Sequence, residues 1–427
     1  MRESSPRLAD ARARGAVVAR ATLLDPAFDL LAAYTRHDGF LFERAGVGVA
    51  AGGEMLHEET VPTADAQGIR ALGASVLGLL RSLNSSGTLP VAVGALPFDP
   101  QQSATVLIPA ACVRRTDRGE TWLLRFADRE GATGDFLPHR IGRSHSSEAF
   151  SPMQILEHPE AEAYERAVAS ALEGIRDGEV AKVVLARTIE VAAGRRLDPR
   201  TLAQRLRAVD PSAITFAAPV SAAASLVGAS PELLVSRRGR RVRSTPLAGS
   251  SPRSGDPDID RAHASRLLAS EKDREEHAIV VDSVAETLEP FCERLSRDPE
   301  PVVLETANVW HLATRFVGWL REPVPSALDL VAALHPTPAV CGAPRGKALE
   351  LIRALEPFER GLYAGPVGWI DADGDGDWAI ALRCARLSGD RATLYAGAGI
   401  VGGSDPRSEL EETEQKFRAF LDSLRWS

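Results

Sequence analysis

Lysine is scarce in this chain of 427 residues. Only four of its 50 basic residues are lysines, at positions 182, 272, 347 and 416. A guanidinium stays charged at neutral pH, whereas an amine can lose its proton, so a retained lysine can mark a place where arginine would not serve. Codon usage explains the excess of arginine, but it does not explain why Lys182 and Lys416 lie in the two stretches most typical of a binding site.

Cysteine pairs and long apolar runs are also missing. Cys112, Cys292, Cys341 and Cys384 are far apart and form no CxxC motif, which argues against a zinc site or a disulfide framework. The sequence has no run of about eighteen apolar residues that would predict a transmembrane helix, and its N-terminus lacks the apolar stretch of a signal peptide. We therefore expect a cytoplasmic protein without a membrane partner.

A basic surface is absent as well. The formal net charge is −8, which argues against general nucleic-acid binding, because such binding needs basic residues to neutralise phosphates. The content of 44% hydrophobic and 25% charged residues is that of an ordinary globular protein. The length is sufficient for two or three domains.

The first part of the chain, residues 1–150, alternates strand-like apolar runs with turns and has one helical pattern over Ala66–Leu83. It contains no cluster of acids, bases or metal ligands. We expect it to complete the sheets and to support a second region, residues 151–427. The polar segment at about 140–154 is a predicted linker.

Two stretches of the second region carry potential chemistry. KVVLAR predicts a strand that opens with Lys182, on a face where desolvation would favour a neutral amine. A glycine-rich segment, GAGIVGG, then leads into a predicted helix capped by Ser404 or Asp405. Glu409, Glu412 and Lys416 fall on one face of that helix, although a solvated helix end would show the same pattern.

Two further carboxylates stand out between these stretches. The turn in GASPELL presents Glu232 at a strand end. A long helix is predicted from about Ile259 to Glu289, with an i,i+4 pair between Lys272 and Glu276. The apolar residues that follow place Glu276 near the boundary of the core.

The last part predicts strands at ANVWHLATRFVGWL, YAGPVGWIDADG, DWAIALRCARL and RATLYAGAGIV. Its DADGDGD segment resembles a calcium loop, but position 12 is Leu382 instead of a bidentate glutamate, so a hairpin turn is favoured. Glu276 and Glu412 together could hold Mg²⁺, and Arg383, Tyr363 and Lys416 could hold a carboxylate. The substrate indicated is a small polycarboxylate.

Long ordered motifs between residues 159 and 427 carry a family resemblance. They are KVVLAR, GASPELL, PLAGS, LLASEKDREEH, WHLAT, HPTPAVCG, EPFERGLYAGPVGW, LRCA and AGAGIVGGSDPRSELEET. With them the chain resembles the chorismate-utilising enzymes, and within that family it is most similar to the isochorismate synthases. Residues 1–150 contribute no motif.

The resemblance implies a Mg²⁺-dependent isomerisation of chorismate to isochorismate, in which water enters at C2 and the C4 hydroxyl leaves. It implies that Lys182 is the base for water and that Glu232 is the acid for the leaving hydroxyl. It also implies an α/β (α+β) fold of large, mostly antiparallel sheets packed face to face with helices outside. The further roles implied are Glu276 and Glu412 as metal ligands, Glu409 acting through water, Tyr363, Arg383, Lys416 and the backbone at Gly397 holding the enolpyruvyl carboxylate, and Gly249 and His311 lining the site.

Several alternatives stay open. Salicylate synthases share the lysine and the glutamates but also eliminate pyruvate, and Val340, where leucine is common in the family, suggests some pyruvate-lyase side activity. A catalytically silent binding protein of the same fold is a second alternative. Aminating relatives fit less well, since they tend to lack the lysine at 182, so we expect no glutaminase partner. A monomer is the expected state.

Overall fold

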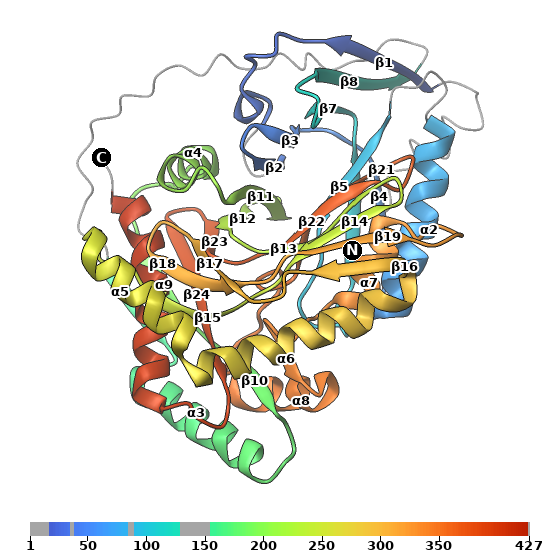
Figure 1. Ribbon diagram of the computed structural model, residues 1–427. Coiled ribbons are helices and arrows are strands. Elements are labelled where there is room, and N and C mark those ends of the chain that lie inside the picture. Colours follow the sequence, from blue (N-terminus) through green and yellow to red (C-terminus); the bar gives the residue numbers. More distant parts are fainter. Residues whose placement is uncertain (1–16, 35–37, 84–88, 129–153, 426–427) are drawn as a thin grey trace.

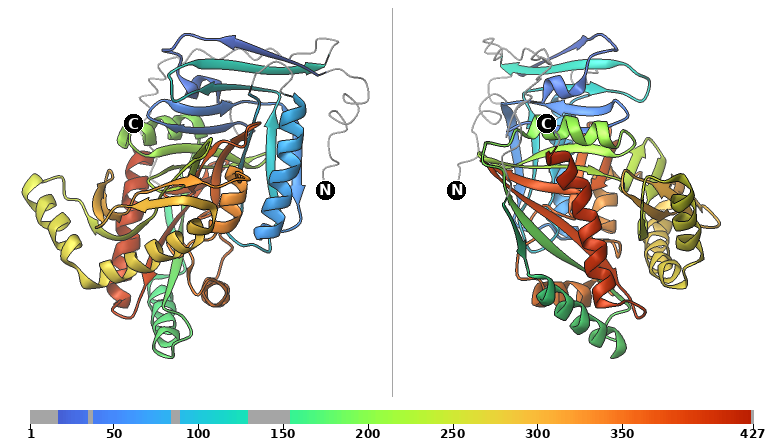
Figure 2. Two further views of the ribbon diagram at one scale, coloured as in Figure 1. Left: turned by 45° about the vertical axis from the view of Figure 1, so that its right-hand side comes forward. Right: turned by 90° about the vertical axis from the view of Figure 1, so that its left-hand side faces the viewer.

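The computed structural model describes residues 17–34, 38–83, 89–128 and 154–425. They form a 12-stranded, a 9-stranded and a 3-stranded sheet, with helices on the outside (Figures 1 and 2). The predicted linker at about 140–154 lies outside the described residues except for its last residue, and so does the predicted domain boundary at 150.

The 12-stranded sheet joins the two ends of the chain. Phe42 pairs with Phe216, so strands within residues 17–128 continue a sheet whose other strands lie within residues 154–400. All its pairings are antiparallel. Its order is β1 (Val17–Leu23), β8 (Thr121–Asp128), β7 (Ala111–Arg115), β3 (Val47–Ala51), β2 (Phe40–Arg44), β11 (Ile214–Ser221), β12 (Ala224–Ser230), β23 (Cys384–Ser388), β24 (Arg391–Ile400), β10 (Lys182–Ala192) and β20 (Gly342–Ala343), with β9 (Gln154–His158) also paired to β10.

The other two sheets are antiparallel as well. The 9-stranded sheet has the order β16 (Cys292–Arg297), β19 (Phe316–Leu320), β14 (Arg241–Thr245), β13 (Leu233–Arg238), β22 (Gly376–Ile380), β21 (Pro366–Asp371), β5 (Val91–Ala95), β6 (Ala104–Pro109) and β4 (Met55–Val61). The small sheet has the order β15 (Leu247–Pro252), β18 (Val309–Ala313) and β17 (Val302–Glu305).

Helices cover the outer surfaces of these sheets (Figure 1). The predicted helix over 66–83 is confirmed, and it buries one stripe that includes Ile69, Leu72, Val76 and Leu80. The helical elements are η1 (Leu30–Ala33), α2 (Ala66–Leu83), α3 (Ala161–Arg176), α4 (Pro199–Val209), α5 (Pro257–Ala269), α6 (Glu271–Leu288), η2 (Glu289–Phe291), α7 (Ala327–Leu334), α8 (Arg345–Leu355) and α9 (Pro406–Arg425).

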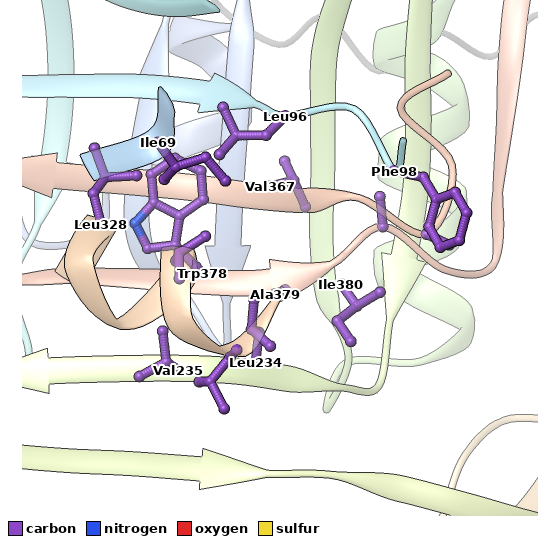
Figure 3. Close-up of a cluster of buried hydrophobic side chains, with 14 of the residues drawn as sticks. Ile69, Leu96, Phe98, Leu234, Val235, Leu328, Val367, Trp378, Ala379 and Ile380 are labelled. Carbon is purple, nitrogen blue, oxygen red and sulfur yellow. The ribbon is translucent and has the colours of Figure 1, made fainter. Parts of the chain in front are cut away.

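One continuous core fills the space between the two large sheets. It contains Phe42 and Phe216 from the 12-stranded sheet and Trp378 from the 9-stranded sheet. Figure 3 shows Trp378 of β22 near Leu328 of α7 and Ile69 of α2. The predicted fold class, mostly antiparallel sheets packed face to face with helices outside, is confirmed. No helix among the described residues is long and apolar enough to span a membrane.

Two predicted strands were wrong in one respect, because the chain passes from one sheet to another within them. DWAIALRCARL forms β22 and β23, which belong to different large sheets, and the change of direction includes Arg383 with a left-handed φ of 49°. ANVWHLATRFVGWL likewise forms β18 and β19, in the small and the 9-stranded sheet. The continuous apolar pattern hides these corners, which let strands serve two packed sheets. By contrast, the turn predicted in GASPELL is present, because it separates β12 from β13 and places Glu232 at the crossing.

The single long helix predicted over 259–289 is also wrong. Ser270 leaves the helical conformation, with φ −70° and ψ 116°, and separates α5 from α6. Its hydroxyl accepts a hydrogen bond from the N–H of Asp273 and so caps α6. A serine followed three residues later by an acid is a helix-start signal that the helical spacing concealed.

The DADGDGD segment forms the turn of the β21–β22 hairpin, as predicted. Asp371 accepts hydrogen bonds from the N–H groups of Asp373 and Asp375, both at 3.0 Å, and pairs with Arg114 at 2.9 Å. Asp375 pairs with Arg237 at 2.8 Å. These two carboxylates therefore serve the turn and its neighbouring strands.

Candidate active site

One cavity, the main cavity, opens at the corners where strands change sheets. It encloses about 710 Å³, part of it open to solvent, a size suited to a small ligand. All the predicted site residues line it except Lys182 and Glu409. Both of these are buried next to carboxylates of the same region, Lys182 against Glu276 and Glu409 beside Glu412.

Glu232 enters the main cavity from the crossing between β12 and β13. Ser230 holds this corner, because its hydroxyl donates to the carbonyl of Ile380 at 2.6 Å and accepts from the N–H of Glu232 at 3.2 Å. Glu232 is 3% exposed. Burial raises the pKa of its carboxyl to about 8, against smaller opposing effects of Leu247 and Lys182. The carboxyl is therefore protonated at neutral pH and can donate a proton.

Lys182 is the first residue of β10 and has no exposed surface. Its Nζ forms an ion pair with Oε1 of Glu276 at 3.0 Å. No acceptor among the described residues meets this Nζ in hydrogen-bond geometry. Gly399, on the paired strand β24, makes room for this ion pair. A Cβ there would lie 2.1 Å from Oε1 of Glu276 and 3.1 Å from Cε of Lys182, so any side chain at 399 would displace one of them.

Three of the chain's four lysines pair with the three predicted metal ligands. Lys182 contacts Glu276, Lys272 contacts Glu409 at 2.5 Å, and Lys416 contacts Glu412. The fourth, Lys347, pairs on the surface with Glu350. The predicted pair between Lys272 and Glu276 is wrong, because Glu276 is directed into the core and Lys272 instead reaches across to α9.

The electrostatics of α9 favour a cation. Burial and the charge of Glu412 raise the pKa of Glu409. Burial also acts to raise the pKa of Glu412, but Lys416, Lys272 and Ser250 together lower it below its usual value. One carboxylate oxygen of Glu409, Oε2, is buried without a hydrogen-bond partner among the described residues. Across those residues no group of three acidic, histidine or cysteine side chains converges on one metal position. A metal here would therefore rely on one or two carboxylates together with water or substrate oxygens, which is the usual coordination of Mg²⁺.

Another part of the main cavity offers groups that bind a carboxylate. Arg383 donates from Nη2 to Nε2 of His311 at 2.9 Å, and its Nη1 is buried without a hydrogen-bond partner among the described residues. Lys416 donates to the carbonyl of Gly397 at 2.8 Å. Tyr363 stacks on Tyr395 with the ring centres 4.8 Å apart. A Cβ at Gly397 would lie 3.2 Å from the hydroxyl oxygen of Tyr363.

The sequence did not predict the contacts that Gly399, Lys272 and Arg360 make. Arg360 is buried, pairs with Glu356 and donates to the carbonyls of Val184 and Val340, both at 2.8 Å. It therefore fixes β10 to the segment that carries Val340. The scarcity of lysine was a signal for Lys272, and the glycine-rich segment was a signal for Gly399, but neither shows which partner lies across the fold.

Known proteins resemble this chain over most of its length. A family model described as "chorismate binding enzyme" matches residues 31–425. The chain is 41% identical over 374 residues to the isochorismate synthase DhbC of Bacillus subtilis, covering 86% of this chain and 89% of the relative. It is 39% identical over 333 residues to the isochorismate synthase EntC of Escherichia coli K12, covering 78% of this chain and 81% of the relative.

A solved structure supports the fold. The structure of MenF, the menaquinone-specific isochorismate synthase of Escherichia coli, matches with a TM-score of 0.81, covering 96% of this chain and 94% of that one. Its sequence identity of 24% limits this comparison to the fold. The family resemblance derived from the motifs is confirmed by the family model and the two sequence relatives.

Proposed function

This chain belongs to the chorismate binding enzyme family, and we propose that it is an isochorismate synthase that converts chorismate reversibly into isochorismate with Mg²⁺. The observation that carries the proposal is a buried, protonated glutamic acid that lines the main cavity, together with a buried lysine that pairs with Glu276 of the same lining. A reaction that adds water at one ring carbon and expels hydroxide from another needs one base and one acid. Relatives of about 40% identity carry the same activity in their names.

Lys182 is the proposed base. Its amine removes a proton from the water that attacks C2, which a guanidinium could not do at neutral pH. The surrounding burial excludes bulk water and keeps the amine directed toward Glu276. This requirement for an amine gives a chemical reason for a lysine at 182 in a chain that otherwise uses arginine.

Glu232 is the proposed acid. With a pKa of about 8 its carboxyl holds a proton at neutral pH and gives it to the hydroxyl that leaves C4. In the reverse direction the two residues exchange roles, since the carboxylate then accepts a proton and the ammonium donates one. The two groups are coupled, because Lys182, when it is protonated, acts to lower the pKa of the Glu232 carboxyl.

The residues present fit a Mg²⁺ ion. Glu276 and Glu412 are the proposed direct ligands, and Glu409, with one buried unpartnered oxygen, would act through water. When bound, the ion supplies positive charge for the ring carboxylate of chorismate. Arg383, Tyr363, Lys416 and the backbone at Gly397 hold the enolpyruvyl carboxylate, while Gly249 and His311 support the wall of the cavity.

The test is incubation of the purified protein with chorismate, with Mg²⁺ or with EDTA, followed by chromatography of the products. We expect an equilibrium mixture of chorismate and isochorismate that does not form with EDTA. Salicylate with equimolar pyruvate would identify a salicylate synthase instead. No turnover by a folded protein would support the silent binding protein and refute the proposal.

A further inference from the structure

A second cavity adjoins the main one where α4, α9 and the β17–β18 turn meet the end of β12. It encloses about 460 Å³, part of it open to solvent. Figure 1 shows α4, α9, β17 and β18 on the same side of the molecule. Pro231 and Arg383 line both cavities, so one guanidinium borders two separate spaces.

The second cavity is mainly apolar. Its apolar lining includes Leu206, Val209, Ala229, Val309 and Phe420. These side chains come from four elements, the helices α4 and α9 and the strands β12 and β18 of two different sheets. Such a surface favours a ligand with a flat or compact apolar body, because burial of apolar area drives binding.

Arg383 is the single cation among the described residues that line the second cavity. Its Nη2 is committed to His311, but its Nη1 is buried and has no hydrogen-bond partner among the described residues. A buried N–H group of a guanidinium that lacks a partner is costly, and a carboxylate is its best acceptor. The second cavity thus combines an apolar lining with one anion-binding group.

Asp210 also lines the second cavity, but its carboxylate is already engaged. It accepts hydrogen bonds from the N–H groups of Ser212 at 3.1 Å, Ala213 at 3.2 Å and Ala307 at 3.3 Å, and from the Ser212 hydroxyl at 2.7 Å. These donors stabilise its negative charge, which also acts on the nearby Arg383. The bond to Ala307 also ties the β17–β18 turn to the end of α4, so the second cavity is formed without a ligand.

We propose that the second cavity binds a compact aromatic carboxylate, with its ring among Leu206, Val209 and Phe420 and its carboxylate on Arg383. The ligand shares Arg383 with the substrate carboxylate of the proposed reaction. Binding therefore opposes that of chorismate, a consequence that rests on the proposed function. The binding of the aromatic carboxylate itself does not rest on it.

The test is calorimetric titration of the full chain with benzoate as the probe and with benzyl alcohol as its neutral counterpart. We expect a roughly millimolar dissociation constant for benzoate, as suits a ligand of this size. Benzyl alcohol should bind at least about tenfold more weakly, because it lacks the charge that Arg383 recognises. Equal binding of the two would overturn the role of Arg383.

Two variants that fill the second cavity test whether benzoate binds there. Val209→Trp adds bulk to the second cavity from a half-exposed position at the end of α4. Ala307→Leu adds bulk from the β17–β18 turn. Each should weaken benzoate at least about tenfold and leave chorismate turnover intact. Val220→Trp, at a similarly exposed valine of β11 outside both cavities, is the matched control and should change neither.

Benzoate binding that survives both filling variants would place the probe elsewhere and overturn the proposal. Saturating chorismate should raise the apparent dissociation constant of benzoate in the parent protein. The two proposals can fail separately. Benzoate bound as expected without chorismate turnover would refute only the proposed function, and turnover without benzoate binding would refute only the second site.

Discussion

Arg383 donates a hydrogen bond from Nη2 to Nε2 of His311, 2.9 Å away. Since arginine cannot accept, Nε2 carries the lone pair, and Nδ1 carries the proton and donates to the carbonyl of Gly249 at 3.3 Å. Gly249 has a φ of +77°, a conformation that favours glycine. Burial, followed by the charges of Arg383 and Lys416, lowers the pKa of His311 to about 3. His311 is thus a neutral acceptor that orients the guanidinium.

We predict that His311→Ala raises the KM for chorismate about tenfold and changes kcat much less. The guanidinium loses the acceptor that fixes its direction, which weakens binding of the substrate carboxylate in ground and transition states alike. His311→Gln, which retains an acceptor, should recover part of the loss. Steady-state kinetics of both variants provide the measurement, and a fall in kcat at unchanged KM would instead identify His311 as a proton donor or acceptor.

The pH dependence should report Glu232. The proposed acid is active while protonated, and its pKa is about 8, so kcat/KM for the isomerisation should fall as the pH rises through about 8. Glu232→Gln should reduce kcat by about a hundredfold or more, because the amide has no proton to give. An unchanged alkaline limb in a partly active Glu232→Gln variant would assign that limb to another group.

The same carboxyl should limit stability. Its folded pKa of about 8 lies above its ordinary value of 4.5, so the unfolded chain releases a proton that the folded chain retains. Folding is then penalised increasingly as the pH rises from about 4.5 to about 8. Glu232→Gln should therefore be more stable than the parent at pH 7, by about 1 to 3 kcal/mol in urea unfolding, with no such difference near pH 4. Lower stability of the variant at pH 7 would contradict this account.

Metal affinity should depend on the inward face of α9. We predict that Glu412→Gln weakens Mg²⁺ binding at least about tenfold, measured by calorimetry in the presence of chorismate, since it removes one of the two proposed direct carboxylates. Glu411→Gln is the matched control on the same helix, because Glu411 is exposed and pairs with Arg407. Equal losses in the two variants would indicate a general effect of charge and not a ligand.

Val340 provides a test of side activity. It lines the main cavity, is 3% exposed, and is held through its carbonyl by Arg360. If the smaller side chain leaves the enolpyruvyl group loosely held, the parent protein should release some pyruvate, and Val340→Leu should release less. A coupled pyruvate assay provides the measurement. Equal pyruvate from both proteins would remove the hypothesis.

The sequence predicted those features that depend on local chemistry. The start of α9 follows from a cap and a proline, and the hydrogen bond from Ser408 N–H to Asp405 bears out Asp405 as the cap. The β21–β22 turn follows from its acidic and glycine residues. The family motifs also identified the residues that meet at the main cavity, although their roles stay predictions.

What the sequence did not predict are pairings across the fold. An i,i+4 spacing favoured Lys272 with Glu276, but the burial of Glu276 against Lys182 leaves Lys272 free to reach Glu409 on a helix 137 residues away in sequence. Likewise, Arg383 was assigned to a strand, because an apolar pattern does not distinguish one sheet from two that share a corner. Such contacts depend on packing between distant segments, which spacing along one segment does not encode.

The most direct test of the central claim is to run the reaction in water labelled with heavy oxygen and to analyse the products by mass spectrometry. We predict that isochorismate gains one labelled oxygen, at the C2 hydroxyl, and that Lys182→Met, a variant of similar volume, forms none while it still binds chorismate. Isochorismate without label, or full activity of Lys182→Met, would contradict attack by water activated at Lys182.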